Sequence, residues 1–108
     1  MITEQDVEKA VDYLRSNATH AAQARAERIY MEEYRKVVKA TIMREQYQAA
    51  NAQEARAYAD PRYAEHLKVM KEAIKADEYN RWMMSAAEAK IEAWRTQQAN
   101  ERALGKLG

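Results

Sequence analysis

The chain has 108 residues, with 18 Lys and Arg against 17 Asp and Glu, 47% hydrophobic residues, two Gly, one Pro and no Cys. A chain of this length forms one domain with a modest core. The net charge of +1 excludes an argument from overall charge for binding nucleic acid or an anionic membrane. Without cysteine there is no disulfide, no thiol nucleophile and no thiolate ligand for a metal.

The N-terminal segment MITEQDVEKAVDYL is acidic and amphipathic, and no apolar run follows a cationic leader in it. No stretch of the chain approaches the roughly 18 apolar residues that a membrane span needs. We therefore expect a cytoplasmic protein that does not act on a membrane.

The composition predicts an all-α protein. The sequence contains 22 Ala and is rich in Glu, Lys, Arg, Gln and Met, which are the strongest helix formers. Both glycines, Gly105 and Gly108, lie at the C-terminal end, so the residues that hairpins and phosphate-binding loops commonly need are missing.

A first helix is predicted near residues 4–16. Thr3 and Asp6 resemble a capping box, and an apolar stripe with helical spacing follows them, formed by Val7, Ala10, Val11 and Leu14. The segment 16–19, Ser-Asn-Ala-Thr, favours caps, so we expect a break there, or a kink, with Asn17 or Thr19 as the next N-cap.

Two long helices are predicted after this break. The second runs over about 19–50, with an end as late as Tyr58 left open. Asp60 is a good N-cap and Pro61 fits a first helical turn, so the third helix runs over about 61–102, with a stop at Leu104-Gly105.

The third helix carries a heptad pattern along its length, which predicts a coiled-coil-like seam. The seam positions are Tyr63, His66, Met70, Ala73, Asp77, Asn80, Met84, Ala87, Ile91, Trp94 and Gln98. Alanines bury little area, so we expect Leu67, Val69, Ile74 and Met83 to widen the seam. Asp77, Asn80 and Arg81 interrupt it and must find polar partners.

The second helix has an apolar arc wider than half its circumference, which predicts packing on more than one neighbour. The arc contains Ala22, Ala26, Ile29, Tyr30, Tyr34, Val37, Val38, Thr41 and Ile42. The predicted fold is thus a short N-terminal helix plus two long antiparallel helices in a coiled-coil-like bundle that a homodimer completes. The alternative is a monomeric three-helix bundle with a bent third helix.

A basic stripe lies opposite this arc, formed by Arg25, Arg28, Arg35, Lys36 and Lys39, with Glu32 among them. One interpretation is a solvated face with i,i+4 support from Glu32 to Lys36. The other is a contact surface for phosphates or for an acidic protein.

The sequence also predicts a partner surface of aromatic and methionine residues. Trp82, Met83 and Met84 form an adaptable patch of the kind that binds partner helices, and Trp94 is a further candidate. The alternative is that the first helix covers the patch.

Nothing in the sequence predicts catalysis, a metal site or a cofactor. His20 and His66 stand apart from each other and from any metal-ligand spacing, so His66 is expected in the seam. Adjacent carboxylates such as those of Glu32 and Glu33 point in different directions on a helix, and no GxSxG motif or Gly-rich phosphate loop occurs.

The run AEAKIEAWRTQQANERA at positions 87–103 resembles small all-helical proteins of unknown function encoded by phages and prophages. This resemblance implies an early-gene accessory role beside recombination or replication genes, or inhibition of a host system. It transfers no catalytic residue. The expected function is that of a non-enzymatic adaptor or inhibitor that binds a protein, and the alternative is a nucleic-acid-binding accessory protein.

Overall fold

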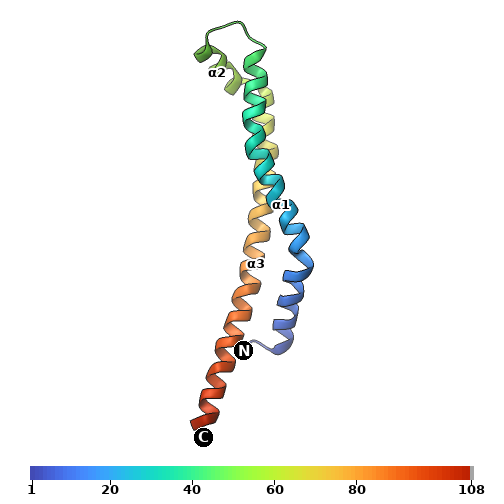
Figure 1. Cartoon of the computed structure of the whole chain (residues 1–108), viewed down its shortest axis with the longest axis vertical. Coiled ribbons are helices and arrows are strands. Elements are labelled where there is room, and N and C mark those ends of the chain that lie inside the picture. The colour runs from blue at the N-terminus through green and yellow to red at the C-terminus, as the bar shows by residue number, and fades with distance from the viewer. Residues whose placement is uncertain (108) are drawn as a thin grey trace. The chain divides into compact units, whose positions relative to one another are not determined.

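The computed structural model describes residues 1–107, which form three α-helices: α1 (Glu4–Arg44), α2 (Ala50–Ala59) and α3 (Pro61–Leu107) (Figure 1). No strand occurs in that range, so the predicted all-α class is confirmed. No helix in the same range has an apolar stretch long enough to cross a membrane.

The start of α1 is held by the predicted capping box. The Thr3 backbone N–H donates to the Asp6 carboxylate at 2.9 Å, and the Asp6 N–H donates to the Thr3 hydroxyl at 3.1 Å. These two bonds satisfy backbone donors that lack partners within the helix. The bond from the Thr3 backbone also lowers the pKa of Asp6.

The predicted break at residues 16–19 is wrong, because α1 continues through this segment. The side chain of Asn17 donates to the Asn80 side-chain oxygen of α3 at 3.1 Å and does not cap a new helix. The Ser16 hydroxyl donates to the Tyr13 carbonyl at 3.4 Å, a bond that is compatible with an unbroken helix. The expected first two helices are therefore one.

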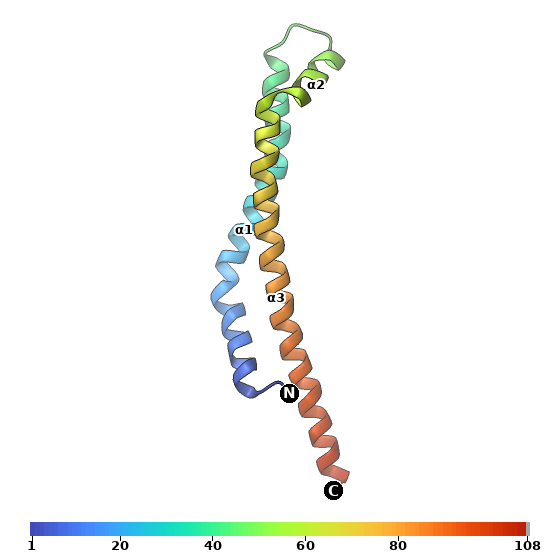
Figure 2. The ribbon, with the colours of Figure 1, turned by 180° about the vertical axis from the view of Figure 1, so that it is seen from behind.

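The end of the second predicted helix is also wrong. α1 ends at Arg44, and the short helix α2 follows a turn in which the Glu45 N–H donates to the Ile42 carbonyl at 3.2 Å. Figures 1 and 2 show α2 in the connection between α1 and α3. Ala57 of α2 is 0% exposed, so this short helix contributes to the core of unit 2.

α3 begins at Pro61 as predicted. The Asp60 carboxylate accepts the Arg62 backbone N–H at 2.8 Å, which is the expected N-cap bond. The predicted stop near residue 102 is wrong, because the helix continues to Leu107 with Gly105 inside it. Among the described residues none has a positive φ, so Gly105 does not serve as a left-handed cap.

The chain divides into two compact units, and each unit draws on both long helices. Unit 1 combines Met1–Ala21 with the described residues from Tyr79 onward, and unit 2 is Ala22–Glu78. The expectation of a single domain stays a prediction.

The predicted heptad seam of α3 matches the burial in both units, since every one of its positions is buried or half-buried. A seam with the same spacing extends along α1, interrupted at the exposed Arg35. It contains Val7, Ala10, Leu14, Asn17 and Ala21 in unit 1, and Ala24, Arg28, Met31, Val38 and Ile42 in unit 2. The expected widening is mostly wrong, because Leu67, Val69 and Met83 are 38–45% exposed and only Ile74 of the four is half-buried.

The wide apolar arc on α1 is covered over only part of its width. Val38 and Ile42 are half-buried and buried, whereas Ile29, Tyr30 and Val37 are about half exposed, at 48–57%. Among the described residues the buried hydrophobic core is Ala10, Ile42, Ala57 and Ala87. Three of these four are alanines, so the core buries little apolar area.

Candidate interaction surfaces

The predicted partner patch divides into exposed and half-buried residues. Trp82 and Met83 are 72% and 40% exposed, whereas Met84 and Trp94 are half-buried at seam positions. Tyr79, which the sequence reading missed, is 64% exposed and lies three residues before Trp82 on α3. We call Tyr79, Trp82 and Met83 the Trp82 patch. Tyr79 is spaced i, i+3 from Trp82 and i, i+4 from Met83, which places the three residues on neighbouring turns. This spacing is visible in the sequence and could have identified Tyr79 as part of the patch.

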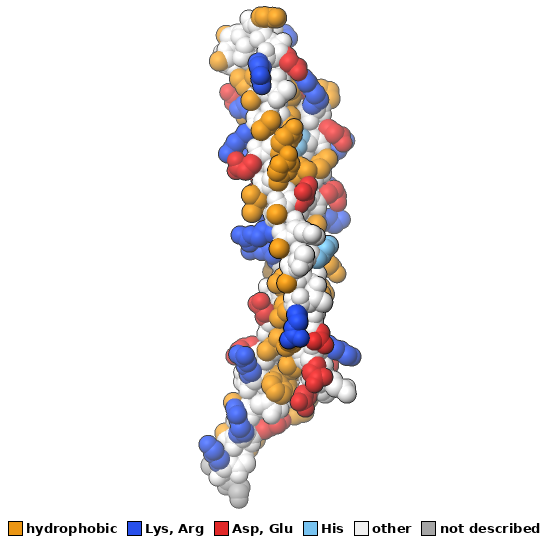
Figure 3. Space-filling view, turned by 45° about the vertical axis from the view of Figure 1, so that its right-hand side comes forward, with side chains coloured by type: hydrophobic (Ala, Val, Ile, Leu, Met, Phe, Trp, Pro, Cys, Tyr) orange, Lys and Arg blue, Asp and Glu red, His pale blue; other side chains and the backbone are white. Residues whose placement is uncertain are grey.

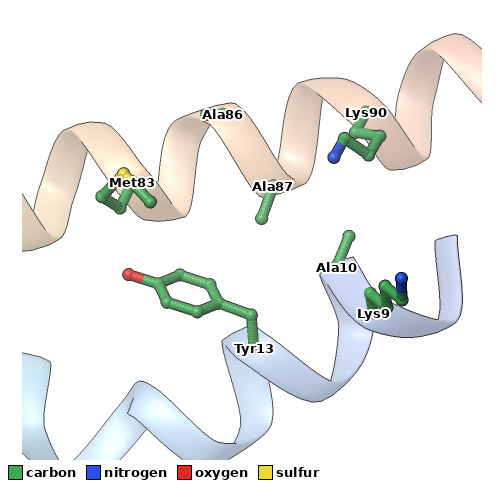
Figure 4. Close-up of a pocket in the computed structure, with 7 residues that line it drawn as sticks. All are labelled: Lys9, Ala10, Tyr13, Met83, Ala86, Ala87 and Lys90. Carbon is green, nitrogen blue, oxygen red and sulfur yellow. The ribbon is translucent and has the colours of Figure 1, made fainter. Parts of the chain in front are cut away.

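A shallow pocket of about 190 Å³ adjoins this patch in unit 1. Its lining comes from α1 and α3: Lys9, Ala10, Tyr13, Met83, Ala86, Ala87 and Lys90 (Figure 4). Figure 4 shows the Tyr13 ring extending toward α3 and the lysines Lys9 and Lys90 at the other end of the pocket. The pocket exists because Ala10 and Ala87 are too small to fill the space between the helices.

These contacts bear on whether the first predicted helix covers the partner patch, which the sequence left open. α1 reaches Met83 through the pocket lining, whereas Trp82 stays largely exposed. The first helical segment therefore does not cover the patch.

Arg28 was predicted on the exposed basic stripe, but it lies in the seam of unit 2. Its guanidinium contacts three carboxylates, at 2.8 Å to Glu32, 2.7 Å to Glu78 and 3.1 Å to Asp77. Asp77 is only 3% exposed, so this cation neutralises a buried charge. The hydrogen bonds to Glu32 and Glu78, followed by the bond to Asp77, raise the pKa of Arg28.

The other residues of the stripe differ in their pairing. Lys36 lies 3.1 Å from Glu33, and Lys39 lies 3.1 Å from Glu54 and 4.7 Å from the centroid of the Tyr58 ring. Bonds to Tyr58 and then Glu54 raise the pKa of Lys39. Arg25 and Arg35 are exposed. The five bases therefore do not form one free cationic surface.

Three of these bases meet two tyrosines at a second pocket in unit 2. This pocket has a volume of about 280 Å³ and is lined by Arg35, Lys36, Lys39, Tyr58 and Tyr63. The Tyr58 and Tyr63 rings meet edge to face, with centroids 5.2 Å apart. The sequence reading did not connect the tyrosines to the stripe, because it did not foresee the fold of α2.

His66 is 9% exposed at its seam position, as expected. Its Nε2 lies 2.7 Å from the Met31 carbonyl oxygen. A carbonyl only accepts, so Nε2 carries a proton and donates it. Within the described part of the chain, no group of three or more His, Cys, Asp or Glu side chains is placed to hold a metal ion.

A third surface is an apolar strip on α1 in unit 2, formed by Tyr30, Tyr34, Val37 and Thr41, which we call the α1 strip. All four residues are exposed. The rings of Tyr30 and Tyr34 stack with centroids 5.6 Å apart, and the Tyr34 ring lies 5.7 Å from His66 of α3. In the upper part of Figure 3, hydrophobic side chains gather on the face that this view presents.

No family model matches the chain, and neither the curated proteins nor the solved structures include one that is similar to it. The resemblance of positions 87–103 to phage-encoded helical proteins stays a prediction.

Proposed function

We propose that this protein is a non-enzymatic interaction protein, an adaptor or inhibitor whose Trp82 patch binds a helix of a partner protein. The observation that carries this proposal is the 72% exposure of Trp82 on the helix that also exposes Tyr79 and Met83. An aromatic side chain buries about 150–250 Å² when it is covered. Trp and Tyr are also the residues that most often dominate the binding energy of an interface.

The surroundings of the patch indicate the chemistry of the partner. The adjoining pocket has an apolar lining from Ala10, Ala86 and Ala87, and Lys9 and Lys90 place two positive charges beside it. An amphipathic helix with apolar residues on one face and carboxylates at their edge complements this surface.

The proposal includes a homodimer in which α1 and α3 of each chain run antiparallel. In unit 2, α1 residues with higher numbers contact α3 residues with lower numbers: Arg28 contacts Asp77, and Met31 contacts His66. The chain exposes 8211 Å² at a mass of 12.5 kDa. A compact monomer of that mass exposes about 6200 Å². A second copy of the chain would bury part of this additional exposed surface.

The setting of this function is a phage-type accessory role in the cytoplasm. The resemblance of positions 87–103 to phage-encoded helical proteins supports it. The partner is then a host or phage protein.

The direct test places a photo-crosslinking amino acid at Ala86, an exposed residue of the adjoining pocket, and, as a matched control, at Arg95, an exposed residue of the same helix. The proposal predicts that position 86 crosslinks one protein from an extract of the source cells, through an acidic amphipathic helix. Competition with the unlabelled chain removes this product, and competition with the Trp82→Ala variant does not. Equal products at both positions would contradict the proposal.

A second candidate function is nucleic-acid binding, and the pocket of Arg35, Lys36, Lys39, Tyr58 and Tyr63 favours it. Bases bind phosphates and tyrosine rings stack on nucleobases. Arg28 contributes little to this surface because three carboxylates surround it.

Fluorescence anisotropy with single-stranded and duplex DNA tests this second function. It predicts binding at about 50 mM salt that weakens steeply as salt rises. The Arg35→Glu and Lys36→Glu changes should abolish binding, whereas Lys68→Glu, an exposed base outside the pocket, should not. No anisotropy change with micromolar protein at low salt would exclude this function.

A further inference from the structure

The spacing of the α1 strip is symmetric about its centre. Tyr30, Tyr34, Val37 and Thr41 follow one another in steps of four, three and four residues. Glu27 lies three residues before the strip and Arg44 three residues after it. The pattern therefore reads the same in both directions, with its midpoint between Tyr34 and Val37.

The strip lies on a different face of α1 from the seam. At about 100° per residue it is centred roughly a quarter of a turn away from Met31, Val38 and Ile42. These three residues face α3 and are half-buried or buried, whereas the four strip residues are exposed. A second helix can therefore pack on the strip without disturbing the contacts between α1 and α3.

An antiparallel second copy of α1 fits this pattern. When the midpoints coincide, Tyr34 faces the partner's Val37 and Tyr30 faces the partner's Thr41. The same register places Glu27 opposite the partner's Arg44, twice in the dimer. A parallel arrangement would instead place Glu27 beside the partner's Glu27, which is unfavourable.

Charges near the strip are consistent with this choice. Glu27 and Arg44 are both exposed at the two ends. On the flank between them, Glu33 and Lys36 form an ion pair at 3.1 Å, so their charges largely cancel. The two end charges therefore determine the direction of a second helix.

We propose that the α1 strip is the interface between two copies of this chain, related by a two-fold axis that passes between Tyr34 and Val37. This inference rests on the homodimer of the proposed function. The interface continues onto α3, because the Tyr34 ring lies against His66 and Val69 is 45% exposed on the following turn. A standard interface buries about 800 Å² per partner. The chain exposes more surface than a compact monomer of its mass, and this excess area is more than twice the area that one partner buries in a standard interface. A dimer through the α1 strip therefore does not need to cover the Trp82 patch.

Charge exchange tests the register. Sedimentation velocity over a concentration series measures the dimer dissociation constant of the wild type and of Glu27→Arg, Arg44→Glu and the double variant. Each single change places like charges together at both ends of the interface, so we expect about a tenfold weaker dimer. The double variant restores the opposite pairs and should return to within about threefold of the wild type.

The control is Arg25→Glu, an exposed reversal on another face of the same helix, which should leave the dissociation constant unchanged. A dimer that none of these changes weakens, or a double variant as weak as the singles, would overturn the strip assignment and leave the proposed dimer standing. A wild type that is monomeric throughout would overturn both.

Site-specific crosslinking gives an independent test, because the natural chain has no cysteine. Tyr34→Cys and Val37→Cys variants are treated with a short bismaleimide, separately and as a mixture. The register predicts that crosslinked dimer forms fastest in the mixture, where position 34 of one chain faces position 37 of the other. Equal rates of crosslinking in the mixture and in the separate variants would contradict this register.

Discussion

The guanidinium of Arg28 on α1 lies 3.1 Å from the carboxylate of Asp77 on α3, and Asp77 is 3% exposed. Both residues occupy seam positions that an apolar side chain would normally fill. Glu78 and Glu32 complete the coordination of Arg28, so the buried negative charge has a cationic partner with further bonds. Such a pair contributes to register, because a shifted alignment leaves a buried charge unpaired.

Removing Arg28 alone should destabilise the protein more than removing the whole pair. Arg28→Leu leaves Asp77 without its cation and should lower Tm clearly. The Arg28→Leu/Asp77→Leu double variant fills both seam positions with apolar side chains and should recover most of the loss or exceed the wild type. Thermal unfolding followed by circular dichroism measures both, with Arg25→Leu as the exposed control. A double variant less stable than the single would contradict this account.

Ile42 should be the most sensitive apolar position, since it is 1% exposed and the largest fully buried side chain among the described residues. Ile42→Ala should lower the free energy of unfolding by about 2–5 kcal/mol, because it removes buried area and leaves a cavity. Ile29→Ala, at a position that is 49% exposed, should change it by less than about 0.5 kcal/mol. Urea denaturation distinguishes the two. Equal effects would show that the burial of Ile42 is misassigned.

Gly105→Ala should stabilise the end of α3. Gly105 lies inside the helix, and an added Cβ meets no atom within 4 Å. Alanine is favoured over glycine in a helix by about 0.5–1 kcal/mol, so local amide exchange should slow by about two- to fivefold. Ala103→Gly is the opposite change and should speed exchange. Unchanged rates in both variants would mean that this segment is not helical in solution.

The ion pairs of Arg62 should make stability depend on acid pH. Hydrogen bonds from Arg62 lower the pKa of Glu45 and of Asp60 below their ordinary values of 4.5 and 3.8. A lowered folded-state pKa stabilises the fold at pH above the ordinary value, and this contribution is lost as pH falls through the folded-state pKa.

Asp60→Asn tests this dependence, because asparagine keeps the N-cap of α3 and removes the charge. The variant should have a lower Tm than the wild type at pH 7, and the difference should shrink as pH falls below 3.8, the ordinary pKa of Asp60. A difference that stays constant from pH 7 to pH 2 would contradict the assigned cause.

Local signals in the sequence were sufficient for much of the fold. The capping box of Thr3 and Asp6 and the Asp60-Pro61 start of α3 depend on neighbouring residues, and both are confirmed. The α3 seam was predicted position by position, because an unbroken heptad fixes which side of a long helix faces its neighbour.

The errors came from residues whose structure depends on distant partners. Asn17 has cap propensity, but its bond to Asn80, sixty-three residues away, places it in a continuous helix. Arg28 seemed exposed because the seam of α1 was not traced past the expected break. In the partner patch, Trp82 was placed correctly on the surface, whereas the roles of Tyr79, Lys9 and Lys90 depend on how α1 meets α3. Helical spacing alone does not provide that register.

In the proposed homodimer, a second copy of the chain covers apolar faces that one copy leaves exposed. The most direct measurement is the molar mass of the wild-type chain by sedimentation equilibrium across a concentration series from about 1 to 100 μM. For a chain of 12.5 kDa, the homodimer predicts a mass that approaches twice this value as concentration rises. A mass of 12.5 kDa throughout the series would contradict it.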